Sequence, residues 1–238
     1  MNEHKIPKRK NIFEATVGLI SHYICKLLVR TTITPNQITF ISGIFGIIGA
    51  YLLTLDYYKY TFLAGIFIVL FTIFDGVDGD IARMKNMQSF FGQWLDNQFD
   101  KLNDVLIIFG MAYGVYHKTN NYTFLVLGMV LMGLIYLIQY SMAANNRIYK
   151  SAKNKVETEN KKIRNDFSQK IPLIKQFHNF FQQHLLLEHC TFLFLVSVFC
   201  FIDKIEIGLY VLLFHGLITY LYIILFGFMI LRVRYSES

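Results

Sequence analysis

Apolar residues in this chain form long runs that charged or polar patches separate. A bilayer core about 30 Å thick needs about 20 residues of helix to cross it, so runs near this length predict transmembrane helices. We predict six of them, at residues 37–55, 61–84, 90–116, 122–142, 189–203 and 207–231. The fifth run is short and spans only if residues 185–188 contribute, so a five-span or re-entrant arrangement stays open. The pattern predicts an all-α, polytopic membrane protein.

Composition supports a membrane protein and argues against a soluble domain. Hydrophobic residues make up 54% of the 238 residues and charged residues 16%, whereas soluble domains carry about 25% charged residues. The polar, basic N-terminal residues lack a hydrophobic stretch with a cleavage site, so we expect no cleavable signal. Cys25, Cys190 and Cys200 lack the spacing of a metal site or redox pair, and we expect neither zinc nor a disulfide.

Lysine and arginine residues concentrate in alternate connections between the apolar runs. They precede the first run, lie between the second and third, fill residues 147–175 and follow the sixth. Short loops rich in these residues stay cytoplasmic, so we expect both termini and these connections on that side. Topology explains the net charge of +7 better than nucleic-acid binding does, because the charge is spread over several loops. We expect a cell inner membrane, or the endoplasmic reticulum if the source is eukaryotic.

Two segments outside the apolar runs have patterns of their own. Between residues 11 and 31, apolar residues recur at helical spacing, which predicts an amphipathic helix on the membrane surface or packed on the membrane domain. We therefore predict a cytoplasmic N-terminal segment at 1–34 and a six-helix transmembrane domain at 35–238. The charged stretch at about 145–184 is expected to be a cytoplasmic loop or a helical extension.

Four carboxylates gather at the predicted cytoplasmic ends of the second and third runs. Asp75 and Asp78 are three residues apart and share one helix face. Asp96 and Asp100 are four apart and form a second face. A short connection makes the two helices antiparallel neighbours and brings the faces together. Each charged group in a membrane costs about 2.5–3.5 kcal/mol, so the cluster requires a cation or a water-filled cavity, and its oxygen ligands suit Mg²⁺ or Mn²⁺.

Small residues beside these carboxylates leave room for a large polar ligand. Gly79 and Ala82 continue the first face, and Gly92 precedes the second. This combination suggests a metal-bound phosphate, with a carboxylate accepting a proton from an attacking hydroxyl. Two other classes of protein stay open: a cation transporter, and a non-catalytic lipid-binding protein with the same carboxylates.

Charged neighbours of the cluster also allow a structural alternative, in which the carboxylates pair with Arg83, Lys85 or Lys101. Asp80 lies off the first carboxylate face and is expected to be solvated or paired with an arginine. Asp104 continues the second face, where it either supports a ligand or is simply solvated.

Polar residues elsewhere have ordinary explanations beside functional ones. Arg147 and Lys150 follow the fourth run on the expected site side, where their charge suits an anionic acceptor as well as cytoplasmic topology. His215 is expected to be a packing residue, with a functional role open, and Trp94 an interfacial anchor.

Eight residues of the carboxylate segment resemble a known family signature. They reproduce DxxDGxxAR, eight intervening residues and GxxxDxxxD, the signature of the CDP-alcohol phosphotransferases. The matching residues are Asp75, Asp78, Gly79, Ala82, Arg83, Gly92, Asp96 and Asp100. The six-span plan and the helix before it are also similar to this family. The pieces ARxK and SxFGxWxD resemble the subgroup that includes di-myo-inositol phosphate phosphate synthases.

This resemblance implies transfer of a substituted phosphate from a CDP-linked alcohol to an acceptor alcohol, with release of CMP, in phospholipid or inositol-phosphate synthesis. It implies two divalent ions on Asp75, Asp78 and Asp96. Asp100 would join these ligands and act as general base. The implied nucleotide-binding residues are Gly79, Ala82, Arg83, Gly92, Asn36 and Thr39. A homodimer is a further expectation from the family.

Overall fold

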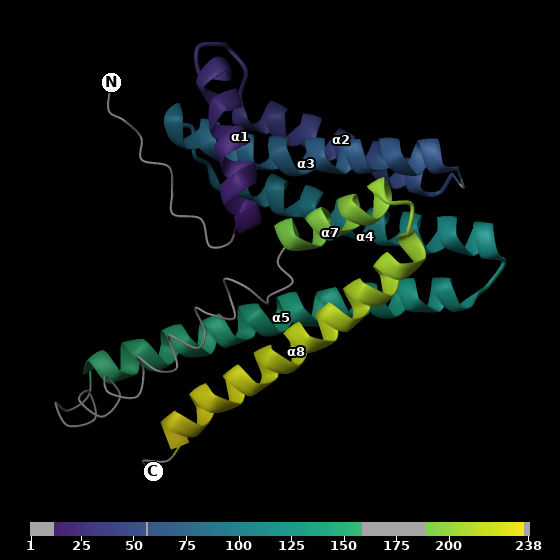
Figure 1. Cartoon of the computed structure of the whole chain (residues 1–238). Helices are drawn as coiled ribbons and strands as arrows, with labels where there is room; N and C mark the ends of the chain where they lie inside the picture. Colours follow the sequence, from purple (N-terminus) through teal and green to yellow (C-terminus); the bar gives the residue numbers. More distant parts are fainter. Residues whose placement is uncertain (1–11, 56, 159–188, 236–238) are drawn as a thin grey trace. The chain divides into compact units, whose positions relative to one another are not determined.

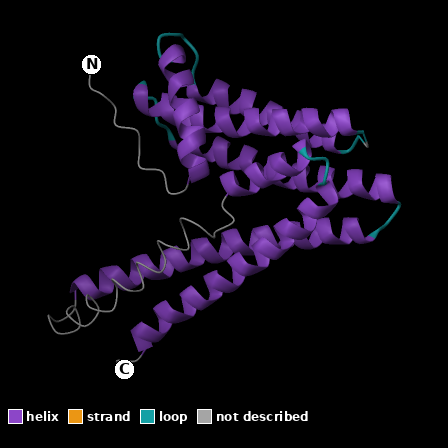
Figure 2. Cartoon of the chain, in the orientation of Figure 1, coloured by secondary structure: helices purple, strands orange, loops and turns teal. Residues whose placement is uncertain are grey.

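The computed structural model describes residues 12–55, 57–158 and 189–235, and within these ranges every regular element is an α-helix (Figures 1 and 2). The helices are α1 (Ile12–Leu28), α2 (Pro35–Leu53), α3 (Tyr58–Met84), α4 (Phe90–Thr119), α5 (Thr123–Thr158), α7 (His189–Phe201) and α8 (Ile205–Tyr235). The all-α prediction is confirmed for the described residues. The six predicted apolar runs correspond, in order, to helices α2, α3, α4, α5, α7 and α8, with ends that differ by a few residues except at the end of α5.

The helices form two compact units. The first contains α1 to α4, the start of α5 through Met132, α7, and the start of α8 through Leu212. The second contains the remaining parts of α5 and α8, which meet through Leu134, Ile138, Tyr222 and Ile223. All four motif carboxylates belong to the first unit.

Helix α2 packs against both α3 and α4 through small residues (Figure 1). Gly49 faces Ile68 of α3, and Gly46 faces the Asn103 side chain of α4. On α4, Gly110 and Gly114 lie against main-chain carbonyl groups of α2. Close approach through small residues is the usual way that helices associate in membranes. The bundle that carries the motif therefore depends on residues without side chains.

The outer surface of this unit is largely apolar. On α2, bulky residues such as Phe40, Ile44 and Ile47 are exposed, while Ser42 and Gly46 are buried. In the part of the chain that the structure describes, four helical segments are long and apolar enough to cross a membrane: Pro35–Leu53, Tyr58–Met84, Thr123–Asn145 and Ile205–Phe228. Bulky residues outside and small ones inside suit a lipid environment, because lipid tails solvate the exposed side chains.

Two of the six predicted spans, α4 and α7, are not among these long apolar segments. Helix α4 has 30 residues, but its first half carries several charged and polar side chains. Helix α7 is apolar but has only 13 residues. Residues 185–188, which were expected to lengthen it, lie outside the described part of the chain. The structure thus supports four spans by length and composition.

Helix α1 packs on α3, which is the second of the two arrangements expected for it. The contact uses small buried residues: Ser21 Oγ donates to Ile73 O at 2.9 Å, and Cys25 Sγ to Val77 O at 3.4 Å. The predicted apolar stripe is packed only in part: Ile24 and Leu28 pack against the cluster that contains Val77 and Ile81 of α3, whereas Ile20 and Leu27 are exposed. The contact therefore combines small polar residues with part of the apolar stripe.

The charged stretch after the fourth run begins as helix. Helix α5 continues through Thr158, so residues 145–158 form the helical extension that was one of the two expectations. The rest of the predicted loop, residues 159–184, lies outside the described residues.

We predict that Gly114→Ala lowers thermal stability. A Cβ at this position would collide with the main-chain oxygen of Leu53. Overpacking of this kind costs about 1–3 kcal/mol, more than a helical alanine gains. Melting of the purified protein in detergent measures the change. Gly133→Ala is the matched control, because nothing lies within 4 Å of a Cβ there. Equal melting of the two variants would contradict the packing role.

Candidate active site

The connection between α3 and α4 turns the chain back through residues 85–89 and brings the two halves of the motif together. Asn86 adopts a positive φ of 54° in this turn. Ser89 caps α4, its Oγ accepting from the Gly92 amide at 2.9 Å. As a result, Asp75 lies within electrostatic range of Asp78, Asp96 and Asp100. The four carboxylates meet, as their spacing predicts.

The start of α2 supplies a direct partner for one of these carboxylates. Thr39 Oγ1 donates to Asp78 Oδ2 at 2.5 Å, and both residues are buried. Pro35 begins α2, and Thr34 and Gln37 form a reciprocal capping box around it. The capped first turn fixes the helix start, and with it the position of Thr39 beside α3.

Lys85 holds the approach to α2 in place. Its Nζ donates to the carbonyl oxygens of Thr31 and Ile33, at 2.7 and 2.6 Å. These carbonyls belong to the turn that precedes the Thr34 cap. Lys85 therefore links the end of α3 to the start of α2 and is engaged away from the motif carboxylates.

A cavity of about 580 Å³ opens beside the cluster. Its lining includes Asp78 and Asp96 together with all six residues expected on the nucleotide side: Asn36, Thr39, Gly79, Ala82, Arg83 and Gly92. Asp75 and Asp100 are not among the described residues that line it. The volume falls within the range of about 300–1,000 Å³ that is usual for small-molecule sites.

The cavity also contains residues that the sequence did not single out. They come from the turn and the first part of α4: Met87, Gln88, Phe90 and Gln93, beside Ser89, which begins the SxFGxWxD piece. The sequence could have indicated them through their position between the two halves of the signature, because a short turn that joins two site helices borders the site.

Arg83 forms an ion pair with Asp80 at 2.5 Å. Asp80 is buried and Arg83 is about half exposed, so the arginine-paired expectation for Asp80 is the one that the structure shows. The other nearby lysine, Lys101, lies 3.9 Å from Asp104. Among the described residues, the structural alternative is not formed: Arg83, Lys85 and Lys101 have partners other than the motif carboxylates.

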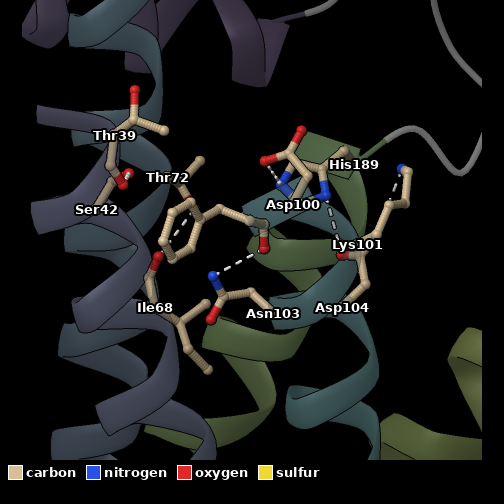
Figure 3. Close-up of polar contacts among 10 residues, drawn as sticks. Thr39, Ser42, Ile68, Thr72, Asp100, Lys101, Asn103, Asp104 and His189 are labelled. Atoms are coloured by element: carbon tan, nitrogen blue, oxygen red, sulfur yellow. Dashed lines mark hydrogen bonds and ion pairs between the residues drawn. The ribbon is translucent and has the colours of Figure 1, made fainter. Parts of the chain in front are cut away.

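His189, at the start of α7, is a site residue that the sequence analysis missed (Figure 3). Its ring lies between two carboxylates of α4: Nε2 is 3.5 Å from Asp100 Oδ1, and Nδ1 is 2.9 Å from Asp104 Oδ1. Phe71 of α3 contacts the ring edge-on, with the ring centroids 5.8 Å apart. A histidine at the edge of the fifth apolar run was the only sequence signal, and it is a weak one.

The donor groups fit a divalent cation. One ligand atom from each of Asp75, Asp100 and His189 lies within 4.8 Å of the others. Among the described residues, Asp100 Oδ1 and His189 Nε2 are buried without a hydrogen-bond partner, while His189 Nδ1 faces Asp104 Oδ1 at 2.9 Å. Clustered carboxylates repel one another unless a cation lies among them. The residues present therefore suit the metal that the motif predicts.

Both expected acceptor residues belong to the second unit. Arg147 is exposed on the part of α5 that belongs to the second unit, and the Lys150 side chain lies outside the described set. His215 also belongs to the second unit. Trp94 is 56% exposed on α4, and its role as an interfacial anchor stays a prediction.

Comparison with known proteins agrees with the motif. The family model for CDP-alcohol phosphatidyltransferase matches residues 32–181, more than half of the chain. The chain belongs to the CDP-alcohol phosphatidyltransferase family. The match covers the start of α2, the cavity and both halves of the carboxylate motif, so the resemblance proposed from eight residues is confirmed.

Among curated relatives, an archaetidylinositol phosphate synthase from Pyrococcus horikoshii is 37% identical over 91 residues, or 38% of this chain and 47% of that protein. A bifunctional IPC transferase and DIPP synthase from Thermococcus kodakarensis is 36% identical over 99 residues, or 42% of this chain and 22% of that protein. The matches thus span about half or less of these relatives.

A solved structure of phosphatidylinositol phosphate synthase from Mycobacterium tuberculosis, with CDP-DAG bound, has a TM-score of 0.62 and 16% identity. The match covers 88% of this chain and 94% of that one. A structure of the same protein with manganese and citrate has a TM-score of 0.63, with 87% and 88% covered. This family member therefore shares the fold over most of both chains.

We predict that Thr39→Val weakens divalent-metal binding by about 10-fold or more, as loss of a partner of a metal ligand typically does. Valine keeps the shape but removes the hydroxyl that contacts Asp78. Titration with Mn²⁺, followed by the electron paramagnetic resonance signal of the free ion, measures the affinity. Thr61→Val is the matched control, because Thr61 Oγ1 bonds only to Tyr57 O, in its own helix region. Equal affinities in both variants would contradict the role of Thr39.

Proposed function

We propose that this protein is an integral membrane CDP-alcohol phosphotransferase. It transfers a substituted phosphate from a CDP-linked alcohol to an acceptor alcohol and releases CMP. The acceptor oxygen forms a bond to the phosphorus that carries the donor alcohol, and the bond from this phosphorus to CMP breaks. The acceptor proton passes to a carboxylate of the protein.

One observation carries this proposal: two motif carboxylates, Asp78 and Asp96, share a cavity with all six expected nucleotide-side residues. A nucleotide in this cavity would place its phosphates beside the carboxylate cluster. Neither a transporter nor a structural cluster requires a cavity of this composition at one end of two helices. Family membership adds independent support.

The cavity residues suggest how the nucleotide is held. Gly79 and Ala82 leave the α3 backbone open to the ligand, and Arg83 carries a half-exposed guanidinium at the rim. A guanidinium suits phosphate oxygens and the charge that develops on departing CMP. Asn36 and Thr39 line the cavity from α2, and Gly92 of α4 lies against the Asn36 side chain.

Asp75, Asp78, Asp96 and Asp100 would hold the divalent metal, and we propose two ions, Mg²⁺ or Mn²⁺. A bound ion of this kind neutralises charge on phosphoryl oxygens. Support comes from the unpartnered ligand atoms at Asp100 and His189 and from the manganese in the solved relative.

Asp100 is the proposed general base. Its side chain is 18% exposed although it does not line the nucleotide cavity. An acceptor hydroxyl can therefore approach Asp100 from outside the space that the donor nucleotide fills. Separate approaches for the two substrates suit a direct transfer between them, because both must be bound at once.

The names of the relatives suggest the substrates. They point to a CDP-linked lipid such as CDP-diacylglycerol as donor and a phosphorylated inositol as acceptor, in phospholipid or inositol-phosphate synthesis. Arg147 and Lys150 are the proposed acceptor contacts, because cationic side chains suit a phosphorylated alcohol.

The remaining parts of the proposal concern the membrane. We propose six spans, with α4 and α7 completing the four apolar ones, and a surface position for α1. The positive-inside distribution supports a cytoplasmic position for both termini and the active site. A homodimer completes the proposal.

Release of CMP tests the reaction. Purified protein is incubated with Mg²⁺ or Mn²⁺, CDP-diacylglycerol and inositol phosphate, and then with a panel of other CDP-alcohols and acceptors. We expect metal-dependent CMP release that Asp100→Asn lowers by about 10²–10⁴-fold, as loss of a general base does. Asp203→Asn is the matched control, because asparagine tolerates the positive φ of 52° there. Absence of CMP with every pair would contradict the reaction, and full activity of Asp100→Asn would contradict the base.

Gly79→Ala tests the nucleotide position. The nearest neighbours of a Cβ here are Arg83 guanidinium atoms at 3.6 Å, so the protein itself accepts the methyl group. A bound nucleotide would lose that space. We expect the KM for the CDP-alcohol to rise about 10-fold or more, with unchanged melting in the absence of substrate. An unchanged KM would place the nucleotide elsewhere.

A further inference from the structure

The metal-binding motif predicts oxygen ligands only, but the structure adds a nitrogen atom to the same place. His189 comes from α7, far from the motif in sequence, and its ligand atom lies within 4.8 Å of those of Asp75 and Asp100. The ring reaches this position because α7 packs on α3 and because Phe71 supports the ring edge.

The orientation of the ring follows from its two carboxylate neighbours (Figure 3). Nδ1 faces Asp104 Oδ1 at 2.9 Å, and Lys101 lies 3.9 Å from the other oxygen of Asp104. Asp104 is buried, with 4% exposure. A carboxylate at Nδ1 is the usual device that orients a metal-binding histidine and leaves its Nε2 lone pair free.

The Nε2 atom faces the motif. It lies 3.5 Å from Asp100 Oδ1, and neither atom has a hydrogen-bond partner among the described residues. Two ligands at neighbouring positions of one ion, each about 2.1–2.6 Å from it, are roughly 3–3.5 Å apart. The spacing of Nε2 and Oδ1 is therefore that of two ligands of one cation.

We propose that His189 is a nitrogen ligand of a divalent cation held with Asp75 and Asp100, and that Asp104 orients it. The inference deepens the proposed function, since the ion is the one on which that function rests. An imidazole ligand favours transition-metal ions over Mg²⁺. His189 therefore gives this site a preference for Mn²⁺ that an all-carboxylate set lacks.

The test reads the coordination of Mn²⁺ directly and needs no substrate. Electron spin echo envelope modulation of Mn²⁺ bound to the purified protein reports a directly bound nitrogen. We expect nitrogen modulation in the wild type and in the control His117→Gln, which changes an exposed histidine at the other end of α4. We expect it to vanish in His189→Gln. The Mn²⁺ dissociation constant of this variant should rise about 10–100-fold.

Competition with Mg²⁺ gives a second measurement. The half-displacing Mg²⁺ concentration gives the Mg²⁺ dissociation constant. The ratio of this constant to the Mn²⁺ dissociation constant should be at least several-fold lower in His189→Gln than in the wild type. If His189→Gln does not fold, judged by melting without metal, His189→Asn takes its place with the same expectations. Nitrogen modulation that survives the His189 substitution, or that is absent from the wild type, overturns the proposal.

These outcomes separate the inference from the proposed function. Metal-dependent CMP release without nitrogen modulation would leave the reaction standing and remove His189 from the metal. Modulation that depends on His189, in a protein that releases no CMP with any substrate pair, would support the ligand and refute the reaction.

Discussion

Four carboxylates held together in a largely apolar bundle are the constraint on which the rest of this structure depends. Each would be better solvated in water, and together they repel one another. Neighbouring residues stabilise or orient the groups of this cluster. Thr39 donates to Asp78, the Arg83 and Lys101 charges are directed to other carboxylates, and His189 approaches from α7. The arrangement leaves the cluster with an excess of negative charge that a divalent cation balances.

The support requires close helix approach, and the small residues of α2 and α4 provide it. Gly46 gives space to Asn103, and Gly110 and Gly114 meet the α2 backbone directly. Bulky apolar side chains on α2 point outward instead. A water-soluble bundle would reverse this pattern. In a bilayer, however, packing rather than hydrophobic burial drives helix association, so small residues inside and large ones outside are favourable.

The site has two sides with different chemistry. Asp78 and Asp96 border the cavity, whereas Asp75 and Asp100 group with His189. The first side suits a nucleotide, because glycine, alanine and an arginine surround it. The second combines a proposed base with the ligand atoms that lack partners. In a transfer between two alcohols, this division separates donor binding from acceptor activation while one carboxylate cluster serves both.

The sequence by itself determined the helices, the meeting of the carboxylates and most of the cavity. Helical spacing of three and four residues places side chains on one face whatever the tertiary packing, and a turn of a few residues brings the second face alongside. Asn36 and Thr39 were found through the family resemblance rather than through spacing.

Only the tertiary structure decided which residues from distant parts of the chain join the site. His189 reaches Asp100 because α7 packs on α3, and Lys85 reaches the turn before α2 because α3 ends beside it. The packed face of α1 combines the hydrogen-bonded Ser21 and Cys25 with only part of the apolar stripe, and the packing against α3 decides which part. Such contacts depend on the relative positions of whole helices, and local periodicity does not encode them.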